Sequence, residues 1–373
     1  TGLPMLNTVA GNLIGTDKYG TGTLGNAGAG IKIFQGASTN RIGTDGDGTS
    51  DDLERNVIAG NAADGVVIRT AFDNTVAGNY IGTNIDGSER LANAGNGVLV
   101  ELNADGNTIG GFIGNVISGN DLNGITLEFS HDNAVAGNLV GTDATGLADL
   151  PNGQNGIFLT WGAANNTIGG NPSQRNTISG NTGTGIAIDG AAAGNWIAGN
   201  WVGIGADGST ALNNFKGITI NNASGQIIGT NSDGVDDGLE GNVVTANELR
   251  GIEIAGNSQL NVIAGNLVGT GPDGVTLVGS QDYGVTLGGN SRNNLVGTDG
   301  DGQSDVFERN VIAGAQGNEV TLIGAGVIGN RVSGNYIGLG SDGTTLVLNG
   351  DRGVTIESGA SGNIIGTNSD GLG

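Results

Sequence analysis

The feature that most constrains this chain is a phrase, N-x-[VI]-[AS]-G-N-x-[IV]-G, that recurs along its whole length. The phrase begins at residues 7, 74, 133, 195, 261 and 330, so successive copies are about 65 residues apart. Its apolar positions alternate with small or polar ones in short runs that end at Gly-Asn. This is the spacing of short strands interrupted by corners, and no stretch has helical spacing with a cap and a stop.

A second phrase lies between these copies and has a variable loop inside it. It reads "NTIGGFIGNVISGN" from residue 107 and "NTIGGNPSQRNTISGN" from residue 166. A short strand pattern, G-[IV]-x-[ILV], follows both phrases, for example "GVLV" at 97 and "GIFL" at 156. Each unit therefore contains a longer and a shorter coil. We expect residues 1–373 to form a single domain of about six double-coil repeats, about eleven coils in all, with essentially no α-helix.

Three very short strands per coil, with glycine and asparagine at the corners, predict an all-β, right-handed parallel β-helix. Glycine and asparagine tolerate the left-handed backbone that sharp corners need. Asparagines at one place in successive coils can stack as a ladder, each amide bonded to the next. Inward-facing valine and isoleucine would fill a long, thin core, which the 36% hydrophobic content can supply.

Composition excludes several classes of function. The chain has 77 glycines, which without a period would indicate disorder and with one indicate a solenoid. It has no cysteine, so disulfides and cysteine-based zinc sites are excluded. The net charge of −23 argues against binding to nucleic acid or anionic membrane. No apolar run is long enough to cross a bilayer, and the start at Thr1 resembles that of a processed chain.

The phrases "NTISGN", "NVISGN" and the "NGI" strand starts resemble the repeats of right-handed parallel β-helix proteins. This is the pectate-lyase-like superfamily, and in particular its polymorphic, NosD-like repeats in large bacterial surface proteins. The resemblance covers Asn7 to Gly366. It implies the fold, but that superfamily includes lyases, hydrolases, epimerases, adhesins and spacers, so it does not imply one activity.

Enzymes of that superfamily rely on calcium-binding aspartates with a nearby arginine or lysine, or on paired aspartates. Here Arg55, Arg175 and Arg309 share one slot of the repeat, which indicates a structural role. His131 is the only histidine, and a lone polar residue at a corner is more often solvated than functional. The pairs Asp51–Asp52 and Asp236–Asp237 belong to a repeated loop. On these grounds we expect no catalytic residues and a chain that is not an enzyme.

The repeated loop itself is strongly acidic, with the pattern [DN]-x-D-G-x-x-D-x-x-E. Carboxylates at alternating positions suit Ca²⁺, and "DGDGxxDxxE" resembles the calcium loops of thrombospondin-type and dockerin-type repeats. The alternative is a solvated turn. The chain ends in a partial copy with Asn368 and Asp370. The candidate metal ligands are Asp45, Asp47, Asp51, Glu54, Asp233, Asp237, Glu240, Asp299, Asp301, Asp305 and Glu308, with Asn231 in the first slot of the second loop.

One outward position of the anchor phrase is always large and apolar. It would form a stripe along the rod, which the following long loop covers or which binds sugar or another copy. The outward residues of the short strands are too mixed for an ice-binding face. The stripe residues are Leu13, Tyr80, Leu139, Trp201, Leu267 and Tyr336.

Two functions fit these observations. The first is a non-catalytic, extracellular structural or adhesive rod of a bacterial surface layer, filament or adhesin, stabilised by calcium. Its partners would be further copies, head to tail or side by side, or a surface polysaccharide. The alternative is a carbohydrate-active β-helix enzyme or a polysaccharide-binding module. An enzyme should have one groove where clustered acids and bases break the repeat, whereas a rod should look alike throughout.

Overall fold

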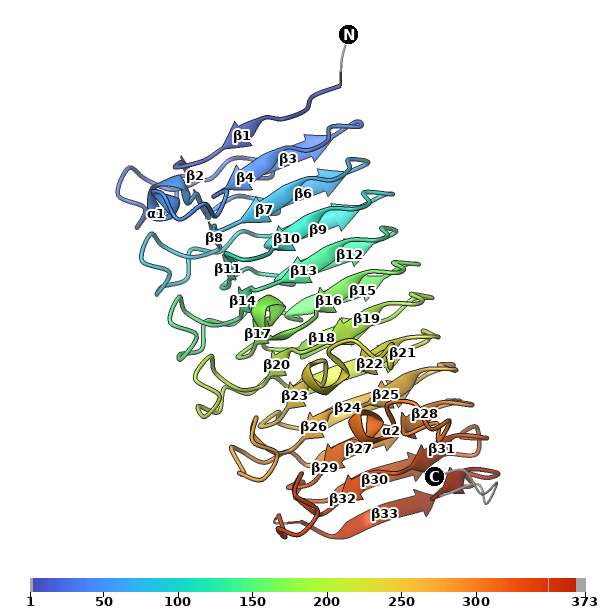
Figure 1. The fold of residues 1–373 in the computed structure, drawn as a ribbon. Helices are drawn as coiled ribbons and strands as arrows, with labels where there is room; N and C mark the ends of the chain where they lie inside the picture. Colours follow the sequence, from blue (N-terminus) through green and yellow to red (C-terminus); the bar gives the residue numbers. More distant parts are fainter. Residues whose placement is uncertain (1–2, 348, 367–373) are drawn as a thin grey trace.

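The chain forms one continuous parallel β-solenoid in the computed structural model, which describes residues 3–347 and 349–366. Each coil gives one short strand to each of three parallel sheets, and the coils rise in chain order from the blue to the red end of the rod (Figure 1). The predicted parallel β-helix of about eleven coils is confirmed, because two of the three sheets have 11 strands.

The first sheet, the twelve-stranded sheet, begins each coil after a corner asparagine. Its strands are β1 (Thr8–Val9), β4 (Arg41–Gly43), β7 (Thr75–Ala77), β10 (Thr108–Gly110), β13 (Ala134–Ala136), β16 (Thr167–Gly169), β19 (Trp196–Ala198), β22 (Ile227–Gly229), β25 (Val262–Ala264), β28 (Leu295–Gly297), β31 (Arg331–Ser333) and β34 (Ile364–Ile365).

The second sheet, the short-strand sheet, follows it across a connection that ends in asparagine and that is a tight Gly-Asn corner or a longer loop in alternate coils. Its strands are β2 (Leu13–Ile14), β5 (Val57–Ile58), β8 (Tyr80–Ile81), β11 (Val116–Ile117), β14 (Leu139–Val140), β17 (Thr177–Ile178), β20 (Trp201–Val202), β23 (Val243–Val244), β26 (Leu267–Val268), β29 (Val311–Ile312) and β32 (Tyr336–Ile337).

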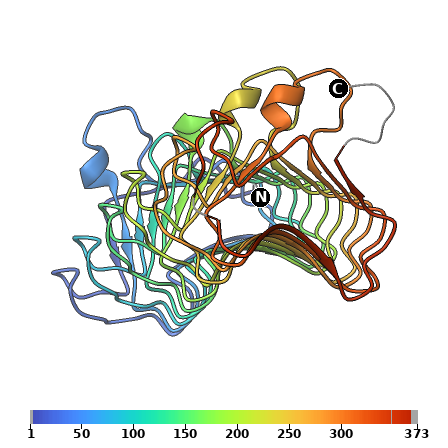
Figure 2. The same ribbon diagram turned by 90° about the horizontal axis from the view of Figure 1, so that it is seen from below.

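The third sheet, the long-strand sheet, closes the coil, and its outer surface is the concave side of the rod (Figure 2). Its strands are β3 (Ile31–Phe34), β6 (Val66–Arg69), β9 (Val98–Glu101), β12 (Ile125–Glu128), β15 (Ile157–Thr160), β18 (Thr184–Ile188), β21 (Lys216–Asn221), β24 (Arg250–Ala255), β27 (Tyr283–Leu287), β30 (Asn318–Ile323) and β33 (Arg352–Glu357).

Helix is confined to short turns in loops between the twelve-stranded and short-strand sheets. These are α1 (Asp51–Glu54), η1 (Pro172–Gln174), η2 (Asp237–Leu239) and α2 (Asp305–Glu308). None of the helices in the described part of the chain exceeds four residues, which confirms the predicted near-absence of helix. In the same residues, no helix combines the length and apolar character that crossing a membrane requires.

The core consists of branched apolar side chains stacked in register along the axis. Ile109 lies between Val76 and Val135 of the neighbouring coils, and all three are fully buried. Each such side chain contributes about 1.5–3 kcal/mol by leaving water. Because every coil presents the same inward positions, the core is long and thin and has no centre.

Three columns of asparagine side chains run along the corners and form the predicted ladders. The first comprises Asn7, Asn40, Asn74, Asn107, Asn133, Asn166, Asn195, Gln226, Asn261, Asn294, Asn330 and Asn363. The second comprises Asn12, Asn56, Asn79, Asn115, Asn138, Asn176, Asn200, Asn242, Asn266, Asn310 and Asn335. The third begins Asn26, Asn61, Asn93, Asn120, Asn152, Asn181, Asn214 and Asn247.

One rung shows how much a ladder asparagine does. The Asn138 amide nitrogen donates to Asn176 Oδ1 at 3.0 Å and to the carbonyl of Ile109 at 2.8 Å. Its Oδ1 accepts from the backbone nitrogen and the side-chain nitrogen of Asn115, at 3.0 and 2.9 Å. The side chain is fully buried. It therefore satisfies corner backbone groups that no water can reach.

The corners also contain a departure from the sequence prediction. Glycine holds some of them, as at Gly110, where a Cβ would lie 1.9 Å from the carbonyl oxygen of Ala136. However, where the long-strand sheet turns into the twelve-stranded sheet, Leu102, Phe129 and Trp161 take the left-handed conformation, with φ of 54°, 45° and 49°. Backbone hydrogen bonds between coils hold them there, such as Leu102 N–H to Glu128 O at 3.2 Å. Glycine and asparagine alone therefore do not account for the corners.

The third ladder is interrupted near the C-terminal end. Ala315 takes the place of an asparagine, and Glu319 stands where the neighbouring coils have Gly284 and Gly353. Glu319 Oε1 accepts from Ala315 N at 3.1 Å, while Glu319 Oε2 and the side-chain atoms of Gln281 are buried without a partner among the described residues. Burial raises the pKa of Glu319 to about 7.

Replacing one ladder asparagine should destabilise the rod. In Asn138→Ala, two buried donors of Asn115 lose their acceptor, and we expect a loss of about 3 kcal/mol in the free energy of unfolding. Urea denaturation followed by far-UV circular dichroism measures it. Asn257→Ala is the matched control, because Asn257 belongs to an exposed asparagine pair with Asn290. Equal effects of the two changes would contradict the role assigned to the buried ladders.

Glu319 should make stability fall as pH rises. The folded chain keeps the Glu319 proton up to a pKa of about 7, whereas the unfolded chain loses it near the ordinary glutamate pKa of 4.5. Between these values the folded state binds more protons, so ionisation costs about 3 kcal/mol of stability by pH 7. We expect the difference in unfolding free energy between Glu319→Gln and the natural chain to grow in the variant's favour from pH 4.5 to 7. Parallel pH profiles would contradict this.

Candidate functional site

The three complete acidic loops leave the rod between the twelve-stranded and short-strand sheets. The first contains α1, the second η2 and the third α2. All three lie on the side opposite the concave face (Figure 2). The partial copy with Asn368 and Asp370 lies outside the described residues.

The first and third loops have the same geometry. Carboxylate oxygens of Asp45, Asp47 and Asp51 lie within 4.8 Å of one another, and those of Asp299, Asp301 and Asp305 do the same. In the first loop, Arg41 also contacts Asp45 at 2.5 Å, so a side-chain cation already offsets part of the negative charge.

The fourth acid of these two loops has a different place. Glu54 accepts from the backbone nitrogen of Asp45 at 3.0 Å, and Glu308 accepts from that of Asp299 at 3.0 Å. These glutamates close the loops and do not join the groups of three aspartates. The acids that converge most closely in these loops are therefore the aspartates.

The second loop differs and contacts the third. Its converging acids are Asp233, Asp237 and Glu240, and Glu240 also accepts from the Asn231 backbone nitrogen at 3.1 Å. Ser232 Oγ donates to Glu308 at 2.7 Å, and the Ser304 hydroxyl donates to Asp237.

Burial raises the pKa of Glu240, and the charges of Asp237 and Asp233 raise it further. Crowded hard oxygens of this kind can hold a metal ion.

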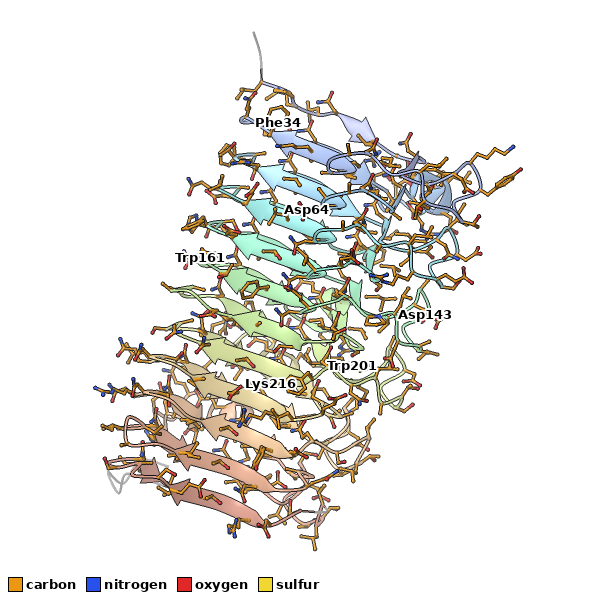
Figure 3. The ribbon with its side chains drawn as sticks, turned by 180° about the vertical axis from the view of Figure 1, so that it is seen from behind. Phe34, Asp64, Asp143, Trp161, Trp201 and Lys216 are labelled. Carbon is orange, nitrogen blue, oxygen red and sulfur yellow. The ribbon has the colours of Figure 1, made fainter. Side chains whose placement is uncertain are left out.

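A different group of side chains occupies the concave face. The outward positions of the long-strand sheet are mostly small or uncharged, but two clusters of charge interrupt them. The first lies at Lys216, in the middle of the face (Figure 3). The second lies at Glu101 and Glu128, nearer the N-terminal end of the rod.

The first cluster joins two bases through one acid. Lys216 and Arg250 start neighbouring strands, and Glu253 lies between their side chains. Glu253 Oε2 is 2.6 Å from Lys216 Nζ, and its Oε1 is 2.8 Å from Arg250 Nη1. The Glu253 side chain is only 12% exposed, so the ion pairs are partly shielded from water.

An open cavity of about 390 Å³ lies against this cluster. Asp189, Phe158 and Thr219 line it together with Lys216 and Glu253. The cavity therefore combines donors, acceptors and one aromatic ring, a mixture typical of ligand sites.

The second cluster places two carboxylates in neighbouring strands. Glu101 and Glu128 are register partners, and Arg69 Nη1 lies 3.5 Å from Glu101 Oε1. Burial raises the pKa of Glu128, and the charge of Glu101 raises it further. One carboxylate is thus held by an arginine while its neighbour has an increased tendency to keep a proton. Such pairs are suited to acid–base chemistry.

Neither cluster was identified from the sequence, although an alignment of the strand patterns contains a signal for the first. Aligned on the glycine of the strand pattern, the preceding residue is asparagine at Asn96, Asn123 and Asn155, and then basic at Lys216 and Arg250. The pairing of Glu101 with Glu128 depends on the exact length of one coil. Only the register of the strands reveals it.

The residues weighed as catalytic candidates have structural partners. His131 Nδ1 lies 3.1 Å from Asp105 Oδ1 at a corner. Asp52 is exposed and pairs with Arg55 at 2.8 Å. Asp51 accepts from the Thr44 hydroxyl at 2.5 Å. In the second loop, Asp236 has a left-handed backbone at the start of η2, and Asp237 belongs to the group of converging acids.

The three arginines that share a slot each lie over an aromatic ring of the apolar stripe. The distance from the guanidinium carbon to the ring centre is 4.3 Å for Arg55 over Tyr80 and for Arg309 over Tyr336, and 4.2 Å for Arg175 over Trp201. Cation–π contacts of this kind stabilise structure. The predicted structural role of these arginines is confirmed.

The long loops cover much of the apolar stripe. Gly87 packs on the Tyr80 ring, Gly208 on the Trp201 ring and Gly146 on Leu139, each close enough that a Cβ would lie 3.0–3.3 Å from the side chain. These stripe residues are half-buried. Of the two interpretations of the stripe, coverage by the following long loop is therefore favoured over binding of sugar or another copy.

No protein-family model matches the chain, and no curated protein sequence is significantly similar to it. Several solved structures are similar to it at low identity, among them the following three. The A-module of the mannuronan C-5 epimerase AlgE6 from Azotobacter vinelandii is 12% identical, with coverage of 98% of this chain and 82% of that one and a TM-score of 0.46. The DFA-IIIase of Arthrobacter chlorophenolicus A6 is 12% identical, with 94% and 87% coverage and a TM-score of 0.45. PfbA, a surface adhesin of Streptococcus pneumoniae, is 11% identical, with 96% and 79% coverage and a TM-score of 0.25.

The three parallel sheets make the chain a parallel β-helix protein, and at these identities the likenesses concern the fold alone and assign no activity. The prediction that the chain is not an enzyme was nevertheless wrong, because it excluded catalysis where the structure offers candidate residues. The concave face carries clustered acids and bases that break the repeat, the feature that the prediction took to be missing.

Proposed function

We propose that this chain is a carbohydrate-active β-helix that binds a polysaccharide along its concave face. The observation that carries the proposal is the break in repeat symmetry there, where the Lys216–Glu253–Arg250 cluster and the Glu101–Glu128 pair occupy one face. Glu128 and Lys216 are three coils apart, about 14 Å along the rod axis at the usual strand spacing, and Glu128 aligns with Asn221, at the other end of the strand that begins at Lys216. An extended oligosaccharide that crosses the face obliquely would contact both.

A neutral polysaccharide fits better than an acidic one. The chain carries a net charge of −23, which repels polyanions over the range that salt leaves unscreened. On the concave face, here called the groove, the bases Lys216 and Arg250 are already paired with Glu253. Asp189 lines the cavity beside them. Their remaining donors and acceptors are suited to hydroxyl groups.

The carboxyl pair supplies the chemistry of glycosidic bond cleavage. Glu128 donates a proton to the leaving glycosidic oxygen, and Glu101, which contacts Arg69, attacks the anomeric carbon. Water then hydrolyses the glycosyl ester, with Glu128 as the base. Strands lie about 4.8 Å apart in such a sheet, and this short spacing fits direct attack better than attack by an intervening water.

The acidic loops have a structural part in this proposal. Ca²⁺ bound by the converging aspartates would rigidify loops that lie opposite the concave face. The surroundings that supply calcium are extracellular, and we propose a secreted or cell-surface location. Association of copies, head to tail or side by side, stays a prediction.

We expect the chain to release new reducing ends from a neutral β-glucan, and Glu128→Gln to reduce the rate at least 100-fold because the proton donor is lost. Lys216→Ala should weaken glucan binding about tenfold, measured by affinity electrophoresis.

Lys18→Ala is the matched control for binding, since Lys18 lies on an exposed hairpin away from the concave face. Equal mobility of Lys216→Ala and the natural chain in glucan gels would contradict the proposed binding face. Activity that survives Glu128→Gln would contradict only the assigned chemistry.

Chelation of divalent ions should lower the melting temperature, and calcium should restore it. In isothermal titration, Asp301→Ala should lose one class of sites, because the third loop has no side-chain cation on its carboxylates comparable to Arg41 among the described residues. Asp342→Ala is the control, since Asp342 is a lone hairpin acid bonded to Thr345. A natural chain that binds no calcium at millimolar concentration would refute the metal proposal.

A further inference from the structure

A pair of stacked, exposed aromatic rings lies at the corner where the long-strand sheet turns into the twelve-stranded sheet. Phe129 and Trp161 occupy this corner in neighbouring coils, with ring centres 6.2 Å apart and planes inclined by 23°. Phe129 is 42% exposed and Trp161 59%. Figure 3 shows Trp161 at the edge of the concave face.

The aromatic stack ends at Trp161 because the next coil has only small residues at this corner. The next coil has Gly190 and Ala191 at this corner, and Gly190 lies directly against the Trp161 backbone, where a Cβ would be 3.0 Å from its nitrogen. Phe129 covers one side of the indole, and no bulky side chain of the next corner covers the other. The result is a flat apolar step above small residues.

Polar groups surround this step. Asp189 immediately precedes Gly190 and lines the cavity beside Lys216, while Asn165 and Asn222 are exposed at the same corners. Asp189 and Asn222 accept backbone hydrogen bonds from Gly190 and Asn257, and an aliphatic partner would bury their remaining polar atoms without partners, at a cost for each. A second copy of this chain would bring another charge of −23 against them.

We propose that Trp161 is the stacking platform of a sugar subsite and binds one pyranose ring of a polysaccharide that continues into the groove. A pyranose combines an apolar C–H face, which suits the indole, with a rim of hydroxyl groups, which suits Asp189, Asn165 and Asn222. This inference rests on the proposed function and adds the ring type and the residue that recognises it.

Backbone conformation supports the choice of variant for a test. Trp161 has a left-handed backbone, φ 49°, which costs a bulky residue free energy that asparagine mostly avoids. Trp161→Asn therefore removes the ring without straining the corner, and its melting temperature should equal or exceed that of the natural chain. A binding defect in this variant cannot then be attributed to unfolding.

The experiment titrates the natural chain with cellohexaose and follows tryptophan fluorescence. Of the three tryptophans, Trp161 is the exposed one, whereas Trp196 and Trp201 are half-buried. We expect quenching on binding in the natural chain, no such signal in Trp161→Asn, and about tenfold weaker binding of cellohexaose by Trp161→Asn in calorimetry. Phe112→Ala is the matched control, because Phe112 is 90% exposed on the loop side of the rod and should leave affinity unchanged.

The outcomes separate this inference from the proposed function. If Lys216→Ala bound cellohexaose more weakly and Trp161→Asn did not, the stacking role of Trp161 would be wrong. The proposed binding along the concave face would still hold. The reverse result would support the platform and overturn the groove as the binding centre. A change of molar mass in Trp161→Asn, measured by light scattering, would show that the step contacts a second copy and would overturn the inference, as would the absence of any cellohexaose binding at millimolar concentration.

Discussion

The architecture depends on the buried hydrogen bonds between corner asparagines. A parallel solenoid with three corners per coil leaves backbone groups at each corner that the strand ladders do not pair, and water cannot reach them inside the rod. The asparagine side chain resolves this by bonding the next asparagine and the carbonyl of the preceding coil at once, as Asn138 does. Because each rung requires the same residue in the next coil, this bond imposes one sequence phrase on the whole chain.

The same requirement explains why the fold could be predicted from the sequence and the groove could not. Repeated asparagines and glycines are constraints within one coil, so they are visible in a single phrase. Glu101 and Glu128, or Phe129 and Trp161, are neighbours only because intervening loops of particular lengths bring them into register. Those loop lengths vary freely, since a loop outside the ladder costs the fold little. The left-handed Phe129 and Trp161 likewise follow no phrase, because the bonds that hold them come from other coils.

Departures from the repeat therefore carry the information about function. Where the ladder is intact and the outward residues are asparagine and threonine, the stability of the fold accounts for the side chains. Lys216 and Arg250 replace an outward asparagine and contribute nothing to the core, so stability does not explain them. Glu319 is a different kind of departure: it accepts a hydrogen bond from the Ala315 backbone where the ladder is interrupted, and its buried carboxyl makes the local fold sensitive to pH. The location of a departure, on the concave face or within a ladder, distinguishes the two kinds.

The distribution of charge separates two roles on opposite sides of the rod. The acidic loops gather converging aspartates on one side, of which Asp45 alone pairs with a base among the described residues, whereas the acids of the concave face are largely matched by Arg69, Lys216 and Arg250. A cation in the loops would lie across the core from the groove, too far to contact a sugar bound there. Calcium and carbohydrate would then act independently: the ion would stabilise the coils that hold the loops, and these coils in turn fix the strand register on which the groove depends.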